Sequence, residues 1–466
     1  MKRLRPHRDI LLLLLFALAV RLALALVTNN ERGDPDCRAY MSGVWAYHPK
    51  TLVLWIWLPY YFYVTGALTH VFGNPALAGK VLSLVAGTLT IIPLYSLSMR
   101  FFGKTAAVVS GLIFAVFGMH VKMSCLTMTE APFAFLCLSA IALFYSGAQA
   151  EKPRARRLFV SALLLGLAGL LRHEAWALAV ILTVFLLWQP SLRRYAVLYG
   201  LFAAAPFILM GAIDYATRGA FTYRVTELAE GKEAESPAVR FPVSVALRKW
   251  LNIFVTSPGP IVMLLAAIGL WYAAIARKAS AQIALIAVIL MGPIFVLSLI
   301  IEGWLPQARH LTFFELLMLP YAGLGFHVLF SRRKAIGWAA AAVVVLTCAS
   351  QAVVYSYKGM AFGLPIDQRG RREIQVAEFL KPRLTPRERL LVEDYSREAA
   401  GIMLGCEAYK YTSEGADNWK RMLRLSKEMK PTLLVVHAMD PKRIVGGAEI
   451  ERIYSNERYR VYRVNY

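Results

Sequence analysis

Long apolar runs recur along most of the first 355 residues, and they constrain the fold more than any other feature of the chain. A helix needs roughly 20 apolar residues to cross a bilayer. Hydrophobic residues make up 58% of the chain and charged residues only 17%, which is too apolar for a water-soluble domain of this length. Some runs are short, so their ends are approximate, and we expect about eleven spans. The runs lie at about 10–28, 77–98, 105–119, 130–148, 158–171, 174–189, 195–213, 258–276, 281–301, 311–330 and 335–354.

Short basic connectors follow every second run and indicate an orientation. The basic side of a polytopic membrane protein is normally cytoplasmic. The N-terminus is basic too, so the pattern predicts a cytoplasmic N-terminus, an extracytoplasmic C-terminus and a place in the plasma or inner membrane. Such loops also account for a net charge of +23 without nucleic acid as a partner. The basic connectors are 99–104, 151–157, 189–194, 276–278 and 331–334.

The first apolar run raises the question of a cleaved signal peptide. It follows a basic segment, as a signal peptide would, but it is longer than a signal-peptide core and contains Arg21. It also lacks a clear small-x-small cleavage site, so we favour an uncleaved signal anchor. The five cysteines are scattered without metal-ligand spacing and do not form the pattern of a disulfide framework.

The outer connectors are longer and more polar, and the chain beyond them changes character. They lie at 29–76, 120–130, 214–257 and 302–310, and we expect part of the first, rich in Trp and Tyr, to lie flat at the interface. The composition divides the chain into a transmembrane domain, 1–357, and a soluble α/β domain on the outer face, 358–466. In the second domain we expect helices at 373–380 and 417–429 and strands at 389–394, 432–438 and 458–464.

The first outer loop contains two carboxylates directly beyond a membrane span. Asp34 and Asp36 are two residues apart, and Tyr40 follows Asp36 by one helical turn, which would place Asp36 and Tyr40 on one side. A carboxylate beside apolar surface can act as a general base toward a hydroxyl group. The alternative is an Asp-Pro turn in a solvated loop, which suits Asp34 better than Asp36.

Further ionisable residues stand at the same outer boundary. Glu130 ends the second outer loop, with His120 and Lys122 before it; the alternative is a carboxylate that stabilises a helix start. Arg309 opens a later span and suits a phosphate by its bidentate geometry, although it could also extend to the lipid interface. The remaining candidates are His310, beside Arg309, and Arg172, His173 and Glu174, which separate two apolar runs and could instead form a helix–helix turn.

These groups would suit an enzyme that acts on a lipid-linked phosphate. The hydrocarbon tail would stay in the bilayer, basic residues would hold the phosphate, and a carboxylate would deprotonate an acceptor hydroxyl. We therefore expect Asp36, Asp34 and Glu130 to be catalytic. We expect Tyr40, Lys122, His120, Arg172, His173, Glu174, Arg309 and His310 to bind substrate.

Most of residues 1–355 resembles the GT-C glycosyltransferases, in their protein O-mannosyltransferase and aminoarabinose-transferase branch. The resemblance lies in the order of anchor, acidic outer loop, basic inner loops, second outer loop ending in Glu, "LxR" element and soluble outer domain. It is strongest in "DCRAY" (36–40), "FGNPALAGKVLSLVAGTLTIIPLYSLSMRFFG" (72–103), "HVKMSCLTMTEAP" (120–132), "LAGLLRHEA" (167–175) and "RHLTFFELLMLP" (309–320).

The resemblance implies roles for particular residues. The family has an Asp-Glu-x-x-Tyr pattern in its first outer loop, with a catalytic Asp; Asp36 and Tyr40 match it, whereas Cys37 stands at the Glu position and Asp34 would have to replace that acid. Glu130 matches the acidic position of the second outer loop, and Arg309 stands where an arginine near the lipid phosphate is expected. Family members take sugars from polyprenyl phosphates, generally with inversion, and the phosphate leaves without a separate acid.

The resemblance leaves a divalent metal open, because some relatives with clustered acids use one. The chain does not plainly offer enough oxygen ligands, so we expect no obligatory metal or other cofactor. The sequence leaves both the sugar and the acceptor, whether lipid, glycan or protein, undecided. Two other functions stay open: a transporter or lipid flippase, which would favour midplane polar groups and an internal repeat, and a non-catalytic membrane anchor for the outer domain.

Overall fold

The structure is a computed structural model of the 466-residue chain. It describes residues 5–27, 34–47, 49, 58–150, 153–221, 243–276, 286, 308–330 and 334–357, and in the C-terminal part 375–376, 379–380, 382–385, 388–393, 407–411, 426–427, 430–436 and 440–466.

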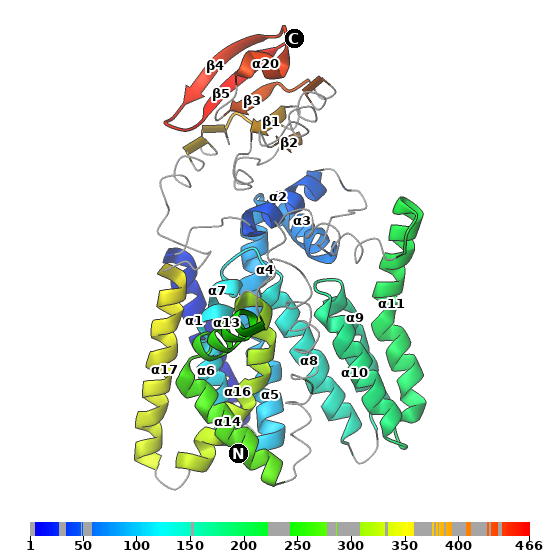
Figure 1. Ribbon diagram of the computed structural model, residues 1–466, viewed down its shortest axis with the longest axis vertical. Coiled ribbons are helices and arrows are strands. Elements are labelled where there is room, and N and C mark those ends of the chain that lie inside the picture. The colour runs from blue at the N-terminus through cyan, green and yellow to red at the C-terminus, as the bar shows by residue number, and fades with distance from the viewer. Residues whose placement is uncertain are drawn as a thin grey trace.

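Helices form the larger part of the molecule, and most of them run along its long axis (Figure 1). The N-terminus lies at the end of this bundle opposite the sheet that contains the C-terminus. The helices are α1 (Arg5–Val27), α2 (Asp34–Tyr47), α3 (Tyr60–Phe72), α4 (Pro75–Leu89), α5 (Ile91–Phe102), α6 (Lys104–Ala115), α7 (Gly118–Ser124), α8 (Glu130–Ala148), α9 (Ala155–Gly169), α10 (Glu174–Trp188), α11 (Arg193–Arg218), α13 (Val243–Thr256), α14 (Pro260–Ile275), α16 (Ala308–Phe330) and α17 (Lys334–Tyr357).

Several helices are long and apolar enough to cross a membrane. Among the described residues there are five such helices, or up to seven if the bent pairs α6–α7 and α13–α14 each count as one span. Only 17% of the apolar window of α1 is buried inside the protein, against 72% for α16, so α1 borders the lipid and α16 is central. The chain is an integral membrane protein with a multi-pass helical fold. The predicted span at 281–301 lies outside the described residues, apart from residue 286.

Close helix packing fixes α16 in the middle of the bundle. At Gly269 of α14, an added Cβ atom would lie 1.9 Å from the Tyr321 carbonyl oxygen of α16, and at Gly325 of α16 it would lie 2.0 Å from the Leu265 carbonyl oxygen of α14. Membrane helices approach this closely where small residues face one another. Arg309 and His310 therefore lie at the start of a helix that is tightly packed against α14.

The first outer loop contains the two short helices α2 and α3. They lie across the end of the bundle, between the long helices and the sheet (Figure 1). The Ser42 hydroxyl of α2 is hydrogen-bonded to the Thr65 hydroxyl of α3, and both side chains are buried. Residues 51–57, the start of the aromatic stretch expected at the interface, lie outside the described residues.

The C-terminal part contains a five-stranded sheet of order β2-β1-β3-β5-β4. The strands are β1 (Arg389–Glu393), β2 (Glu407–Tyr411), β3 (Leu433–Val436), β4 (Glu449–Ser455) and β5 (Arg460–Asn465), with the short helix α20 (Pro441–Val445) before β4. Strand β1 pairs in parallel with β2 and β3, and β5 pairs antiparallel with β3 and β4. The three predicted strands correspond to β1, β3 and β5, whereas the predicted helices lie largely outside the described residues.

Candidate active site

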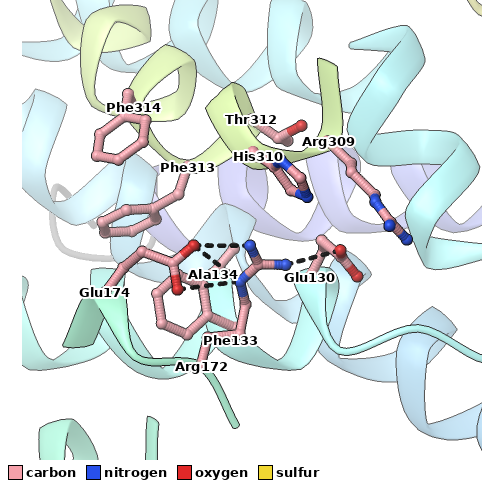
Figure 2. Close-up of a pocket in the computed structure, with 10 residues that line it drawn as sticks. All are labelled: Glu130, Phe133, Ala134, Arg172, Glu174, Arg309, His310, Thr312, Phe313 and Phe314. Carbon is pink, nitrogen blue, oxygen red and sulfur yellow. Dashed lines mark hydrogen bonds and ion pairs between the residues drawn. The ribbon is translucent and has the colours of Figure 1, made fainter. Parts of the chain in front are cut away.

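A row of three charged side chains, of which Glu130 is buried and Arg172 and Glu174 are partly buried, forms the centre of the site. Nη1 of Arg172 lies 2.7 Å from Oε1 of Glu130, and Nη2 lies 2.6 Å from Oε1 of Glu174. Nε of Arg172 donates to both oxygens of Glu174, at 3.2 and 3.3 Å. Figure 2 shows the guanidinium between the two carboxylates. The side chains of Arg172 and Glu130 are only 15% and 5% exposed, so water screens this pair little.

Local helix geometry explains why these residues meet. Glu130 is the first residue of α8 and Glu174 the first of α10, and the positive end of a helix dipole favours a carboxylate at each place. Arg172 lies in the tight connector between α9 and α10, where its backbone N–H donates to the Ala168 carbonyl. The connector thus places the Arg172 cation between the two carboxylates at the starts of α8 and α10.

Arg172 keeps its charge under all ordinary conditions. Burial alone would lower the pKa of its guanidinium, but the nearby carboxylates of Glu174 and Glu130 outweigh burial and raise that pKa above its ordinary value. Arg172 therefore acts as a fixed cation that orients two carboxylates and does not serve as an acid.

The start of α16 closes the site from the opposite side. Arg309 and His310 extend from this helix toward the Arg172 row (Figure 2), and no acidic residue lies in the first turn of α16. The enclosed space is small, about 10 Å³, roughly what one water molecule needs. Its lining consists of Glu130, Phe133, Ala134, Arg172, Glu174, Arg309, His310, Thr312, Phe313 and Phe314.

Five of the predicted site residues therefore converge here from three regions of the chain. The phenyl ring of Phe133, which the sequence did not single out, lies under the Arg172 guanidinium, 5.7 Å from its carbon, and contacts Phe313 of α16. These aromatic positions gave no signal in the sequence because they fall within apolar runs. His173 lies outside this lining and packs its ring against Trp176.

The second outer loop, residues 120–130, is buried as a whole. It comprises most of α7 and the segment that leads to α8. Lys122 is only 6% exposed, and His120 is fully buried against Arg21 of α1. Neither residue is part of the lining of the cavity beside Arg172. That both bind substrate stays a prediction.

Asp34, Asp36 and Tyr40 belong to α2. Its helical backbone places Asp36 and Tyr40 one turn apart, as the spacing predicted. The side chains of all three residues lie outside the described part of the structure. Helix α2 packs against α3 and α4 at the end of the bundle nearest the sheet (Figure 1).

The expectation that no metal is obligatory stays a prediction, because the side chains of Asp34 and Asp36 lie outside the described residues. The described side chains contain no group of three or more His, Cys, Asp or Glu residues that could hold an ion. One oxygen of Glu130 already accepts from Arg172, and Oε2 has no hydrogen-bond partner in the described residues.

The comparisons with known proteins decide the fold. The chain aligns with the crystal structure of ArnT from Cupriavidus metallidurans over 97% of both chains, with a TM-score of 0.66 and 15% identity in the apo state. For ArnT bound to undecaprenyl phosphate, the TM-score is 0.64 and the identity 16%, again over 97% of both chains. The fold is the GT-C glycosyltransferase fold. The resemblance predicted from the sequence is thereby confirmed.

A structure with a lower TM-score and a family model that covers part of the chain are consistent with this fold. The oligosaccharyltransferase AglB from Archaeoglobus fulgidus, in complex with an inhibitory peptide and a dolichol-phosphate, aligns with 93% of this chain and 70% of its own, with a TM-score of 0.55 and 14% identity. Residues 48–213 match the family model of dolichyl-phosphate-mannose-protein mannosyltransferase. That segment includes Glu130, Arg172 and Glu174 and begins after Asp36. No curated protein matches the chain in sequence.

Proposed function

We propose that the protein is a membrane glycosyltransferase that moves a sugar from a polyprenyl-phosphate donor to an acceptor hydroxyl on the extracytoplasmic face. The observation that carries the proposal is the Glu130–Arg172–Glu174 row facing Arg309 and His310, in a fold shared with a protein bound to undecaprenyl phosphate.

The charges of this cluster suggest how the donor phosphate would bind. Arg172 is already balanced by two carboxylates, so the phosphate would need another cation. Arg309 stands at the positive end of the α16 dipole without an acid in that turn, an arrangement that favours an anion. We assign the phosphate to Arg309, with His310 beside it; Lys122 of α7, which does not line the present cavity, would join them once the cluster has opened for the donor. Because the enclosed space is small, side chains of this cluster must move apart as the donor enters.

The polar cluster adjoins an apolar groove that suits an isoprenoid chain. The groove has a volume of about 220 Å³ and lies between α3, α4 and α8. Pro132, two residues beyond Glu130, and Leu171, directly before Arg172, are part of its wall. A phosphate at the cluster and a prenyl chain in the groove would therefore place the scissile bond at the edge of the bilayer.

The chemistry would proceed as a single displacement. Asp36 would accept the proton of the acceptor hydroxyl, whose oxygen attacks the anomeric carbon. A new bond between this oxygen and the anomeric carbon forms as the bond to the donor phosphate breaks, which inverts the configuration. The polyprenyl phosphate leaves as an anion and needs no protonation. Glu130 Oε2 is buried and accepts no hydrogen bond from a described donor, so it is suited to accept one from a hydroxyl group of the sugar.

The orientation belongs to the same proposal. The N-terminus and the sheet lie at opposite ends of the long axis (Figure 1), and the basic connectors predict that the N-terminal end is cytoplasmic. The cluster and α2 would then act outside the cytoplasm, beneath the sheet, which could receive the acceptor.

The deciding experiment is transfer by the purified protein in nanodiscs with a panel of radiolabelled polyprenyl-phosphate sugars. We expect transfer, or hydrolysis of the donor, by the wild type. The Asp36→Asn variant should lose it while still binding undecaprenyl phosphate, because the substitution removes the base and preserves shape. Arg309→Ala should weaken that binding by about tenfold or more, the worth of a charge-assisted hydrogen bond.

Near-normal turnover by Asp36→Asn would show that Asp36 is not the base. Unchanged binding of undecaprenyl phosphate by Arg309→Ala would mean that another cation binds the phosphate. EDTA in a parallel arm tests the expectation that no metal is obligatory: activity should survive it. A wild-type protein that neither reacts nor binds undecaprenyl phosphate would leave the anchor or the transporter as the better explanation.

A further inference from the structure

Arg21 is a fully buried arginine within the first membrane-crossing helix. Its exposure is 0%, although only 17% of the apolar window of α1 is buried. In the sequence it is visible only as a single cation in an apolar run. A charged side chain buried within a membrane-crossing helix is costly and needs a compensating environment. None of the described carboxylates pairs with it, so its partners must be dipoles.

The guanidinium spans the break between α6 and α7. Its Nη1 donates to the Ala17 carbonyl of its own helix and to the Ala115 carbonyl, both at 3.2 Å. Its Nη2 lies 3.2 Å from Nδ1 of His120 on α7. Because a guanidinium can only donate, Nδ1 must be the acceptor and the hydrogen of the neutral ring sits on Nε2. The ring of Phe114 lies 5.0 Å from the Arg21 carbon.

These contacts stabilise a bend that would otherwise be unfavourable in a membrane. Ala115 is the last residue of α6, and α7 departs at an angle of 60°. Carbonyl groups at such a helix end lack partners within the helix, and the bilayer offers no water to replace them. Arg21 donates a hydrogen bond directly to one of these carbonyl groups, that of Ala115. In return, Sγ of Cys125, just beyond α7, contacts the Arg21 carbonyl at 3.3 Å.

The segment so held leads directly to the candidate active site. After α7, Oγ1 of Thr127 donates to the Ala76 carbonyl, and Oγ of Ser83 donates to the Met128 carbonyl at 2.9 Å. Two residues beyond Met128, Glu130 meets Arg172. Any shift of the bend therefore reaches Lys122 within α7 and Glu130 at the end of the loop.

We propose that Arg21 is a positioning residue that locks the α6–α7 bend, so that Lys122 and Glu130 stand where a donor phosphate and its sugar can be held. The lock itself follows from the contacts of Arg21. Its effect on the donor rests on the proposed function.

The test compares Arg21→Met, Arg21→Lys and Arg100→Gln in nanodiscs. The first removes the donors, the second keeps a cation without the planar fork, and the third alters an exposed arginine at the far end of α5. Two quantities are measured: alkylation of Cys125 by N-ethylmaleimide, followed at the peptide level by mass spectrometry, and the Kd for undecaprenyl phosphate. A reduced fraction of folded protein would not change that Kd.

Arg21→Met should raise the rate of Cys125 alkylation and the Kd by about tenfold each, the equivalent of one charge-assisted hydrogen bond. Arg21→Lys should fall between this variant and the wild type, because an ammonium cannot copy the fork that serves two elements. Arg100→Gln should match the wild type. If Arg21→Met fails to fold, the graded effect of Arg21→Lys decides by the same two measurements.

Unchanged alkylation and unchanged Kd in the folded variant would overturn the lock. Faster alkylation with an unchanged Kd would show a purely structural contact and overturn the positioning role. If the wild type itself does not bind undecaprenyl phosphate while the alkylation arm behaves as expected, the lock stands, and the proposed function fails together with the positioning role.

Discussion

Each end of the second outer loop is held by an arginine, partly buried at one end (Arg172) and fully buried at the other (Arg21), and the two are compensated differently. Arg172 meets two carboxylates at the Glu130 end. Arg21, at the other end, meets two carbonyl oxygens and a neutral imidazole. The Arg172 cluster therefore places three fixed charges beside a cavity, whereas Arg21 is surrounded inside the bundle by uncharged polar groups. Under the proposed function, the Glu130 end would take part in the chemistry, and the Arg21 end would fix the shape of the loop.

The largest effect should come from breaking the charged end. Arg172→Met leaves one buried and one partly buried carboxylate without their cation and should lower the free energy of unfolding by about 3–5 kcal/mol. Arg21→Met leaves only a carbonyl and an imidazole unsatisfied, a loss of about 1–3 kcal/mol. Denaturation of the purified proteins in detergent measures both.

A matched control removes the charges along with the cation. The triple variant Arg172→Met, Glu130→Gln, Glu174→Gln should regain part of the stability that Arg172→Met loses, because no unpaired anion remains. A larger loss for Arg21→Met than for Arg172→Met would contradict the comparison, since it would mean that the dipoles around Arg21 contribute more than two carboxylates.

A medium effect should separate the two carboxylates of the row. Glu174 receives three hydrogen bonds from Arg172 and Glu130 receives one. Glu174→Gln should therefore cost more stability, about 1.5–3 kcal/mol. Glu130→Gln should cost less stability but lower sugar transfer more, because Glu130 Oε2 is the oxygen assigned to the sugar. Unfolding and initial transfer rates, measured on the same preparations, would reverse this order if Glu130 were only structural.

The helical membrane fold could be predicted from the sequence, whereas the tertiary contacts of the charged side chains could not. The apolar runs and basic connectors are local features, so the helical membrane fold could be predicted from them. The meeting of Arg172 with Glu130 joins residues 42 positions apart, and that of Arg21 with His120 joins residues 99 apart. No local pattern encodes either contact. Polar residues at the starts of helices indicated the first; a lone arginine in an apolar run was the only signal of the second.

The sheet shows the same limit in another form. The predicted strands became β1, β3 and β5, which occupy the three central positions, whereas the missed strands β2 and β4 are the two edges. The central strands β1 and β3 are rich in buried aliphatic residues, and β5 mixes apolar with polar residues, while the edge strands carry charged residues that hinder further pairing. The sequences of β2 and β4, "EAYKY" and "EIERIYS", are polar enough to resemble a loop.

The smallest effect should come from close packing at the Arg21 end of the loop. Gly87 of α4 faces Ser124 of α7, and a Cβ atom added there would lie 2.1 Å from the Ser124 Oγ atom. Gly87→Ala must therefore push α7 away. Overpacking costs about 1–3 kcal/mol, and the better helix propensity of Ala returns up to about 1 kcal/mol, so we expect a net loss of about 1–2 kcal/mol, visible as a lower Tm.

Two further variants sharpen this result. Gly200→Ala, in α11, would place its Cβ atom 3.2 Å from the Thr183 methyl group, a contact that a small shift relieves, and it should leave Tm nearly unchanged. Adding Ser124→Ala to Gly87→Ala removes the clashing oxygen and should recover part of the loss. A Gly87→Ala protein as stable as wild type would show that α7 can move away from α4 at little cost. The Arg21 end would then be held by the guanidinium alone rather than by guanidinium and packing together.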